Sequence, residues 1–183
     1  PIANVRLEYD ESGNQTGQFV SCLEDKLFQP AGFNWRAKYD KGNLVEKVYL
    51  NNVKEPYLNP NEGYAKYIAK YNERGRLIEL SFFDTEEKPC LNNKGYAKVS
   101  YGYDEWGNVT EILFLGVDGK PCTDSSGVAR CVMRYDERGN KIEEATSDTE
   151  GNPCLNAQGA AKMTAVCDSW GNVTEMTYWG TDG

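Results

Sequence analysis

Carboxylate and basic side chains recur at regular intervals along this chain, and they are the first residues to consider for chemistry. A glutamate stands three positions after each turn Asn or Arg, at Glu46, Glu79, Glu111, Glu143 and Glu175. Basic residues recur on the matching polar face of the segments that precede the turns, at Lys66, Lys98, Arg130 and Lys162. General acid catalysis needs a carboxyl with a raised pKa, and evenly spaced, solvated glutamates beside lysines offer no environment for one. We interpret the set as a structural ladder of cross-strand ion pairs, each pair contributing about 0–1 kcal/mol.

Histidine is absent from the whole sequence of 183 residues. Its absence removes the commonest general base and the commonest metal ligand at neutral pH. Acidic loops such as residues 148–152 lack the dense alternation of oxygen ligands found in calcium-binding loops. We therefore predict that the chain is not an enzyme, and we expect no catalytic residue, no metal site and no cofactor.

Three cysteines, Cys90, Cys122 and Cys154, share one loop position that Tyr57 fills in an earlier unit. If successive units are hairpins, these positions lie about 9–10 Å apart, which is farther than a disulfide reaches. The sequence also has no C-x-x-C pair of the kind that binds zinc. We interpret the three as small apolar fillers, and other pairings among Cys22, Cys131 and Cys167 stay open.

Two tryptophans, Trp106 and Trp170, are predicted at turn tips, where the turn itself does not need an indole. Arg74 and Arg138 occupy the same position in the alternate units. One interpretation is that each ring folds back onto a neighbouring arginine in a cation–π contact. The other is that the four residues bind a ligand, because exposed aromatic rings stack on sugars and anchor protein partners.

The elements that position these residues follow a 32-residue period, marked by Tyr39, Tyr71, Tyr103 and Tyr135, with Cys167 next in the series. Such a period is typical of one supersecondary unit copied in tandem. Before each tyrosine, apolar and polar residues alternate as in a half-buried strand. After it, Asp-Glu-x-Gly supplies turn chemistry and a second alternating strand follows. We expect Tyr103 to lie opposite Asn108, which places Thr110, Ile112 and Phe114 on the face of Val99 and Tyr101.

A long loop joins each hairpin to the next and carries a proline at one fixed position, where we expect it to stop strand propagation. The predicted fold is all-β, a tandem array of about six antiparallel hairpins in an elongated or curved, meander- or solenoid-like sheet. We treat residues 1–183 as one array with units near 9–38, 39–70, 71–102, 103–134, 135–166 and 167–183. Residues 22–32 replace the standard loop in the first unit, and the chain is expected to be a fragment of a longer repeat protein.

The phrase Tyr-Asp-x-x-Gly-Asn, or Gly-Arg at its end, is similar to the YD repeats of bacterial Rhs-type proteins. Its versions here are Tyr9 to Asn14, Tyr71 to Arg76, Tyr103 to Asn108 and Tyr135 to Asn140. The resemblance covers about half of the chain, the hairpin half of every unit. It implies hairpins that wind into a large β-shell, which encloses a toxin or displays surfaces at the cell exterior.

These observations favour a non-catalytic repeat module for protein–protein interaction or structural scaffolding within a larger bacterial protein. The alternatives are a carbohydrate or cell-wall binding module that uses the turn-tip aromatics, and part of a toxin-associated β-shell. The net charge of −8 argues against nucleic acid as a partner, and no apolar stretch is long enough to insert into a membrane. The resemblance implies the cell surface or secretion, whereas free cysteines favour the cytoplasm. The sequence leaves the compartment and the oligomeric state open.

Overall fold

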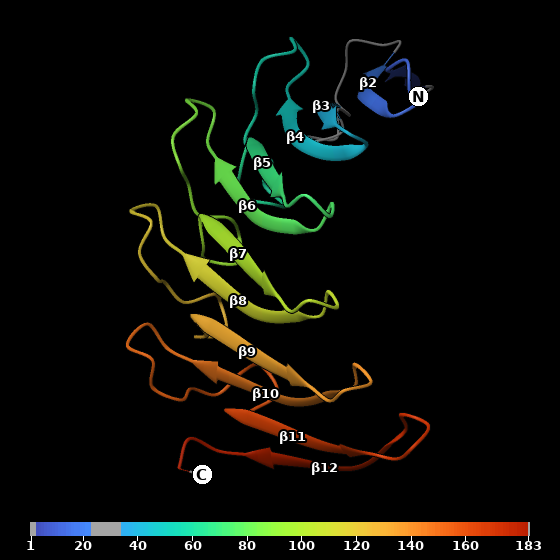
Figure 1. Cartoon of the computed structure of the whole chain (residues 1–183). Coiled ribbons are helices and arrows are strands. Elements are labelled where there is room, and N and C mark those ends of the chain that lie inside the picture. Colours follow the sequence, from blue (N-terminus) through green and yellow to red (C-terminus); the bar gives the residue numbers. More distant parts are fainter. Residues whose placement is uncertain (1–2, 23–33, 183) are drawn as a thin grey trace. The chain divides into compact units, whose positions relative to one another are not determined.

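The computed structural model describes residues 3–22 and 34–182, and every regular element in them is a β-strand. Figure 1 shows the strands as consecutive pairs, each pair forming one hairpin. The described residues include no helix that could cross a membrane. The predicted loop at residues 22–32 lies almost entirely outside the described residues. The strands are β1 (Ala3–Tyr9), β2 (Gln15–Cys22), β3 (Asn34–Asp40), β4 (Asn43–Leu50), β5 (Lys66–Tyr71), β6 (Leu77–Phe83), β7 (Lys98–Tyr103), β8 (Val109–Leu115), β9 (Arg130–Tyr135), β10 (Lys141–Ser147), β11 (Lys162–Cys167) and β12 (Val173–Trp179).

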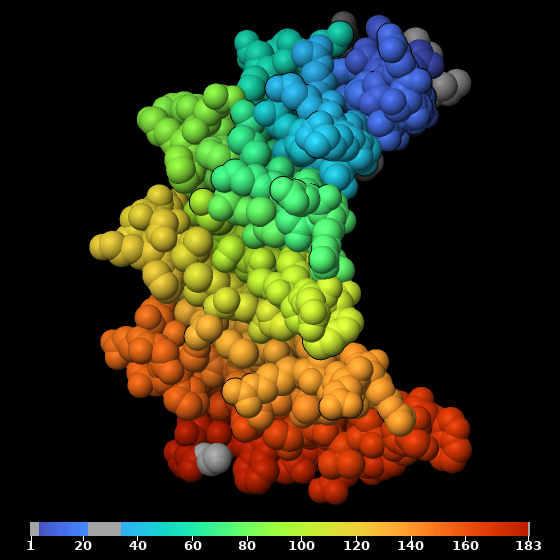
Figure 2. Space-filling view, viewed as in Figure 1, coloured from blue at the N-terminus to red at the C-terminus, as the bar shows by residue number. Residues whose placement is uncertain are grey.

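The chain divides into two compact units, Pro1–Asn93 and Lys94–Gly183. In the first unit, β1 to β6 pair antiparallel in sequence order. In the second, β7 to β12 do the same. Figure 2 shows successive hairpins of each unit stacked one against the next. The predicted all-β array of antiparallel hairpins is therefore confirmed.

Each hairpin has one face that is richer in apolar and aromatic side chains, which we call the inner face. In β7 and β8, Val99 lies opposite Phe114 and Tyr101 lies opposite Ile112. The predicted pair of Tyr103 with Asn108 is wrong, because Tyr103 lies opposite Val109 and a bulge follows at Thr110. The change of partner from Asn108 to Val109 moves the register by one residue, and the bulge moves it by one more, so the rest of the hairpin is shifted by two. A shift of two keeps every side chain on its own face, so the predicted composition of the inner face holds.

The long loops are more ordered than their composition suggested. Between β8 and β9, one turn is closed by a 2.8 Å bond from Gly116 N to Lys120 O, and a second by a 2.7 Å bond from Asp124 N to Val128 O. Between the two turns, Pro121 forms an isolated bridge with Leu115. The loop proline thus belongs to a short antiparallel pairing rather than only ending a strand, and Pro56, Pro89 and Pro153 do the same.

Two residues at the end of each long loop, which we call the lead-in pair, form much of the core. All are buried: Tyr64 and Ala65, Tyr96 and Ala97, Val128 and Ala129, and Ala160 and Ala161. The ring centroids of Tyr64 and Phe82 are 4.6 Å apart, as are those of Tyr96 and Phe114. Aromatic pairs at this distance stabilise a structure beyond their burial alone. In these two hairpins, the first residue of the lead-in pair therefore covers the inner face near the end of the second strand.

Candidate functional site

The hairpin tips hold the predicted ligand-binding residues, and their backbone is fixed by side-chain hydrogen bonds. In the turn after β9, Asp136 Oδ1 accepts bonds of 2.9 Å from the backbone N–H groups of Arg138 and Asn140. Asp136 Oδ2 accepts a third from Asn140 Nδ2, also at 2.9 Å. Gly139 has a φ of +82°, which a residue with a side chain rarely adopts. These interactions explain why the turn needs Asp and Gly.

The same bonds stabilise the charged form of the turn aspartates. The side-chain bond from Asn140 is the main cause that holds the pKa of Asp136 below its usual value, and Asn172 does the same for Asp168. A carboxylate with a lowered pKa stays ionised and accepts hydrogen bonds, but it is a poor proton donor at neutral pH. The turn aspartates therefore stabilise the turns as ionised hydrogen-bond acceptors and are not suited to acid catalysis.

At the third position of each four-residue turn, the backbone N–H group donates a hydrogen bond to the side chain of the first turn residue. The side chain at the third position takes no part in the turn, so the turn does not restrict its type. This position is occupied by Ser12, Arg74, Trp106, Arg138 and Trp170, and all five residues are exposed. The exposed fraction is 71 % for Trp106 and 86 % for Trp170. Arg138 donates a hydrogen bond to the carbonyl of Ser169, in the tip that carries Trp170. The structure thus brings Arg138 to the next tip, where it binds the backbone and leaves the indole in solvent.

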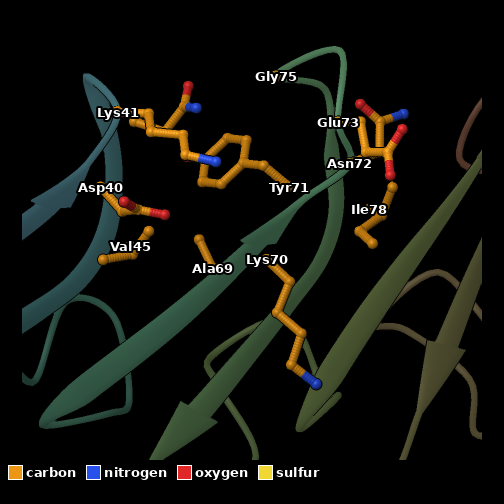
Figure 3. A pocket seen from close by; sticks show the side chains of 11 residues that line it. Asp40, Lys41, Val45, Ala69, Lys70, Tyr71, Asn72, Glu73, Gly75 and Ile78 are labelled. Atoms are coloured by element: carbon orange, nitrogen blue, oxygen red, sulfur yellow. The ribbon is translucent and has the colours of Figure 1, made fainter.

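A groove of about 610 Å³ lies between the tips of the β3–β4 and β5–β6 hairpins. Val45, Ala69 and Ile78 contribute apolar side chains to its lining, and Lys41 and Glu73 contribute charged ones. Figure 3 shows Lys41 extending toward the ring of Tyr71, while Lys70 points away from it. The groove offers an apolar floor with charges of both signs at its rim. No sequence pattern indicated it, because its floor includes bulge residues whose position depends on the backbone.

The predicted ladder of Glu and basic residues lies on the face opposite the inner face. Glu46 pairs with Lys38 of its own hairpin at 2.7 Å and with Lys66 of the next hairpin at 3.4 Å. Glu143 is held in the same way by Arg134 at 3.6 Å and Lys162 at 2.8 Å. These glutamates therefore join strands within a hairpin and between hairpins.

The other members of the ladder vary around this arrangement. Glu111 pairs with Arg130 of the next hairpin, and Glu79 pairs with Lys70 of its own at 2.8 Å. Lys98 occupies the equivalent first-strand position in β7. Glu175 lies opposite Val166, and the described residues give it no ion pair. Most of the cations are exposed, so these pairs set register more than they add stability.

The periodic tyrosines have a role that periodicity alone did not reveal. Their hydroxyl groups donate to the carbonyl of the residue that follows the preceding tip: Tyr71 to Leu44 at 3.1 Å and Tyr135 to Val109 at 2.9 Å. Tyr39 binds Gln15 O in the same way, at 3.2 Å. At these three positions the tyrosine therefore ties its hairpin to the preceding one, and Cys167 lacks the hydroxyl that would do so. No sequence signal distinguished this role from burial of an aromatic ring.

The cysteines are free thiols at all positions whose side chains are described, in agreement with the predicted absence of bridges between Cys90, Cys122 and Cys154. Burial is the main cause that raises the pKa of these three thiols. Burial also raises the pKa of Cys131 to about 11. Because the thiolate is the reactive form, thiols in these environments are weak nucleophiles. The side chain of Cys22 lies outside the described residues.

Lys47 is a charged residue on the inner face that the sequence reasoning missed. Its amine lies 4.8 Å from the ring centroid of Trp35 and 5.0 Å from that of Tyr49. Burial lowers its pKa, and the charge of Glu62 opposes that effect. Equivalent positions hold Leu80, Ile112, Glu144 and Met176, so one other hairpin also carries a charged residue there. The two rings provide a favourable site for the ammonium group, so the cluster is satisfied within the protein.

No group of three or more metal-ligating side chains is found among residues 3–22 and 34–182. The turn aspartates and most of the ladder glutamates are instead engaged in turns and ion pairs. The tip residues reach solvent and vary between units, and a groove lies between two of the tips. We therefore take the hairpin tips as the candidate functional site.

No protein-family model matches the chain, and no curated protein matches it. Among solved structures it is similar to TcdB2-TccC3-Cdc42 with 16 % identity and a TM-score of 0.44, covering 95 % of this chain. It is similar to TcdB2-TccC3-TEV with 15 % identity, 95 % coverage and a TM-score of 0.43. For TcdB2-TccC3 without its hypervariable C-terminal region the values are 12 %, 96 % and 0.46. The chain spans about 9 % of the length of each of these proteins, and likenesses at this level carry no argument about its function.

Proposed function

We propose that this chain is a non-catalytic repeat module for protein–protein interaction or scaffolding within a larger bacterial protein, with the hairpin tips as its contact surface. One observation carries the proposal. The tyrosine bond between hairpins recurs at Tyr39, Tyr71 and Tyr135, whereas the third tip residue changes among Ser, Arg and Trp and stays exposed. A constant framework that presents variable exposed residues is the arrangement typical of repeat-protein binding surfaces.

The chemistry of the tips supports contact rather than catalysis. The pKa of Asp136 and that of Asp168 are lowered, and burial raises the pKa of the loop thiols, so neither group is activated for acid catalysis or nucleophilic attack. Trp and Arg are the residues that contribute most often to the binding energy of protein interfaces. Trp170 and Arg138 lie on successive tips, linked through the Arg138 bond to Ser169 O.

The proposal can be tested by placing a photo-crosslinking amino acid at position 106 or 170 in the protein as its bacterium produces it. We expect crosslinks to a defined protein from both tips. The matched control is position 117, where Val117 is a 56 % exposed loop residue of the same unit away from the tips. Equal crosslinking from all three positions, or none from the tips, would refute the tips as the contact surface.

A second candidate function is carbohydrate or cell-wall binding, favoured by the two indoles that stand 71 % and 86 % exposed. Such rings stack on the apolar faces of sugars. Affinity electrophoresis through gels that contain soluble glycans tests it. Retention that persists in the Trp106→Ala and Trp170→Ala variants excludes this role for the tips.

The family resemblance adds a third candidate, in which the hairpins form part of a β-shell associated with a toxin. The antiparallel hairpin sheet is compatible with a wall of this kind. Limited proteolysis of the full-length gene product tests it. The shell role predicts that a segment of that product is protected from protease until the sheet unfolds, and a product without such a segment contradicts it.

A further inference from the structure

The tip between β3 and β4 is one residue shorter than the tips of the other hairpins. It runs from Asp40 to Asn43, which lie opposite each other. Lys41 and Gly42 between them both have positive φ angles, of 48° and 80°. Positive φ at both central residues is typical of the two-residue type I′ turn, whereas in the longer tips only the glycine has it. The short tip therefore has a different backbone conformation from the others.

The short tip leaves two polar side chains without partners. In four longer tips, the asparagine that follows the turn donates a hydrogen bond to the second oxygen of the turn aspartate, as Asn108 does to Asp104 at 2.9 Å. In the short tip, neither the carboxylate of Asp40 nor the side-chain amide of Asn43 has a hydrogen bond among the described residues. Both side chains line the groove of about 610 Å³ between this tip and the next.

The charges of the groove are unbalanced. Glu73, on the β5–β6 tip, is a second exposed carboxylate without an ion pair in the described part of the chain. Lys70 pairs with Glu79 at 2.8 Å, and Figure 3 shows it pointing away from the other lining residues. Lys41 extends toward the ring of Tyr71 (Figure 3) and has no ion pair among the described residues. Two unpaired carboxylates and one unpaired ammonium group therefore line the groove, which favours a cationic ligand.

The rest of the lining indicates the kind of cation. Val45, Ala69 and Ile78 form an apolar floor on which an alkyl stem can pack. Tyr71 donates its hydroxyl to Leu44 O at 3.1 Å, which holds its ring in place beside that floor. A guanidinium group is planar, donates in pairs to a carboxylate and stacks on aromatic rings, whereas an ammonium group is a compact point charge. The groove volume lies within the range of about 300–1,000 Å³ found for ligand sites, so a neighbouring apolar side chain also fits.

We propose that the groove binds an arginine side chain of a partner protein, presented beside an apolar residue of the same segment. The Asp40 carboxylate accepts the paired N–H groups of the guanidinium, the side-chain carbonyl of Asn43 accepts another, and Glu73 adds the second negative charge. Lys41 extends into the same space and competes with the ligand. With the hairpin tips as the contact surface proposed above, on which this assignment rests, the groove specifies the side chain that two of them recognise.

Isothermal titration calorimetry of the 183-residue chain at low salt tests the groove. The probe is the blocked peptide acetyl-Gly-Leu-Arg-Leu-Gly-amide, and the matched peptide has citrulline, a neutral side chain of the same shape, in place of arginine. We expect the citrulline peptide to bind about tenfold more weakly, because a neutral group loses the charge-assisted bonds. The same peptide with lysine should bind with intermediate affinity, and the one with glutamate should not bind.

Single substitutions locate the binding site. Asp40→Asn and Glu73→Gln should each weaken binding of the arginine peptide about fivefold, near the upper end for an exposed charge pair. Lys41→Met removes the competing cation and should strengthen binding about threefold, which loss of structure cannot do. Glu137→Gln is the matched control, because it removes the equivalent exposed charge from a tip outside the groove, and it should leave binding unchanged.

Lengthening the tip provides a second test. A serine inserted between Lys41 and Gly42 restores the longer turn, in which Asp40 and Asn43 bond with each other. Binding of the arginine peptide should then fall at least as far as in the Asp40→Asn variant. Circular dichroism checks that each variant keeps the fold.

The proposal is overturned if the arginine peptide does not bind, if it binds no better than the citrulline peptide, or if Asp40→Asn has no effect. Binding of the glutamate peptide that is lost in Lys41→Met would assign the groove to an anionic ligand instead. Self-association of the chain that Asp40→Asn abolishes would assign it to a second copy. Crosslinking from positions 106 and 170 does not depend on these titrations, so it distinguishes failure of the groove from failure of the tips as a contact surface.

Discussion

The hydrogen bond from the Tyr135 hydroxyl to Val109 O, 2.9 Å long, makes a sharp test of how hairpins are joined. Tyr135→Phe removes the hydroxyl and keeps the ring, so packing changes little. A typical intramolecular hydrogen bond contributes about 0.5–1.5 kcal/mol to the free energy of unfolding. Tyr135 is only half-buried, so water can replace the lost donor at Val109 O. We therefore expect a loss of about 1 kcal/mol, near the centre of that range.

The chain contains a matched control and a reciprocal variant. Tyr9→Phe removes the same atom from a tyrosine whose hydroxyl is unbonded in the described structure, so it should leave stability unchanged. Cys167 occupies the position of the periodic tyrosine, and the equivalent acceptor is the carbonyl of Lys141. Cys167→Tyr should therefore create the missing bond and stabilise the protein by up to about 1 kcal/mol.

The measurement is equilibrium unfolding in urea followed by far-ultraviolet circular dichroism. Similar slopes for all variants would show that the surface exposed on unfolding is unchanged, so that midpoints report stability. If Tyr135→Phe unfolds at the same midpoint as Tyr9→Phe, the hydroxyl does not join the hairpins as argued.

Three further outcomes follow from the structure. Tyr96→Ala should lower the free energy of unfolding in urea by about 3 kcal/mol, because it removes a buried ring whose centroid lies 4.6 Å from that of Phe114. A loss below about 1 kcal/mol, the size expected of a surface change, would contradict this. Glu143→Gln breaks contacts with two cations but should cost at most about 1 kcal/mol, and the cost should shrink in high salt. The folded pKa of Asp136 lies below the ordinary 3.8, so its stabilising effect is present above pH 3.8 and is lost as pH falls through the lowered folded pKa. Asp136→Asn should keep the turn, because Asn72 accepts the same backbone bonds in its own tip. In acid titrations, the stability of this variant should depend less steeply on pH below about 4 than that of the wild type. An unchanged acid profile would argue against the role of this carboxylate.

Hairpins, faces and tip turns could be predicted because each depends on local chemistry. The alternation around Tyr101 fixes which side chains face inward, and Asp136 with Gly139 fixes the turn. These signals act within a few residues, so one sequence contains them in full. They also repeat, and several independent copies of the same pattern agree.

The strand register could not be predicted, for a physical reason. In the predicted register Val99 lies opposite Ile112, whereas it is observed opposite Phe114, two residues away, and both registers keep Val99 and Phe114 on the same face. Hydrophobic alternation has a period of two, so registers two residues apart bury the same side chains. Only the backbone geometry near the tip distinguishes between them.

The order of the long loops was missed for a different reason. Asp124 and Gly127 have the same spacing as the Asp and Gly of a tip, and Asp124 Oδ1 accepts a 2.9 Å bond from Ser126 N just as a tip aspartate does. The turn spacing was therefore visible in the sequence. Proline at position 121 directed attention to strand termination, although its carbonyl remains free to accept a hydrogen bond. The Asp-x-x-Gly spacing is thus a better signal of loop order here than the presence of proline.

The β11–β12 hairpin keeps the ion pair of Lys162 with Glu143 of the preceding hairpin, but it lacks three other interactions. Cys167 replaces the tyrosine that donates a hydrogen bond to the preceding hairpin, and Ala160 replaces a larger lead-in residue. Val166 lies opposite the ladder glutamate Glu175, whereas in the preceding hairpin Arg134 lies opposite Glu143. Each replacement removes an interaction that other hairpins retain. This hairpin should therefore open before the β7–β8 and β9–β10 hairpins of the same compact unit in hydrogen exchange.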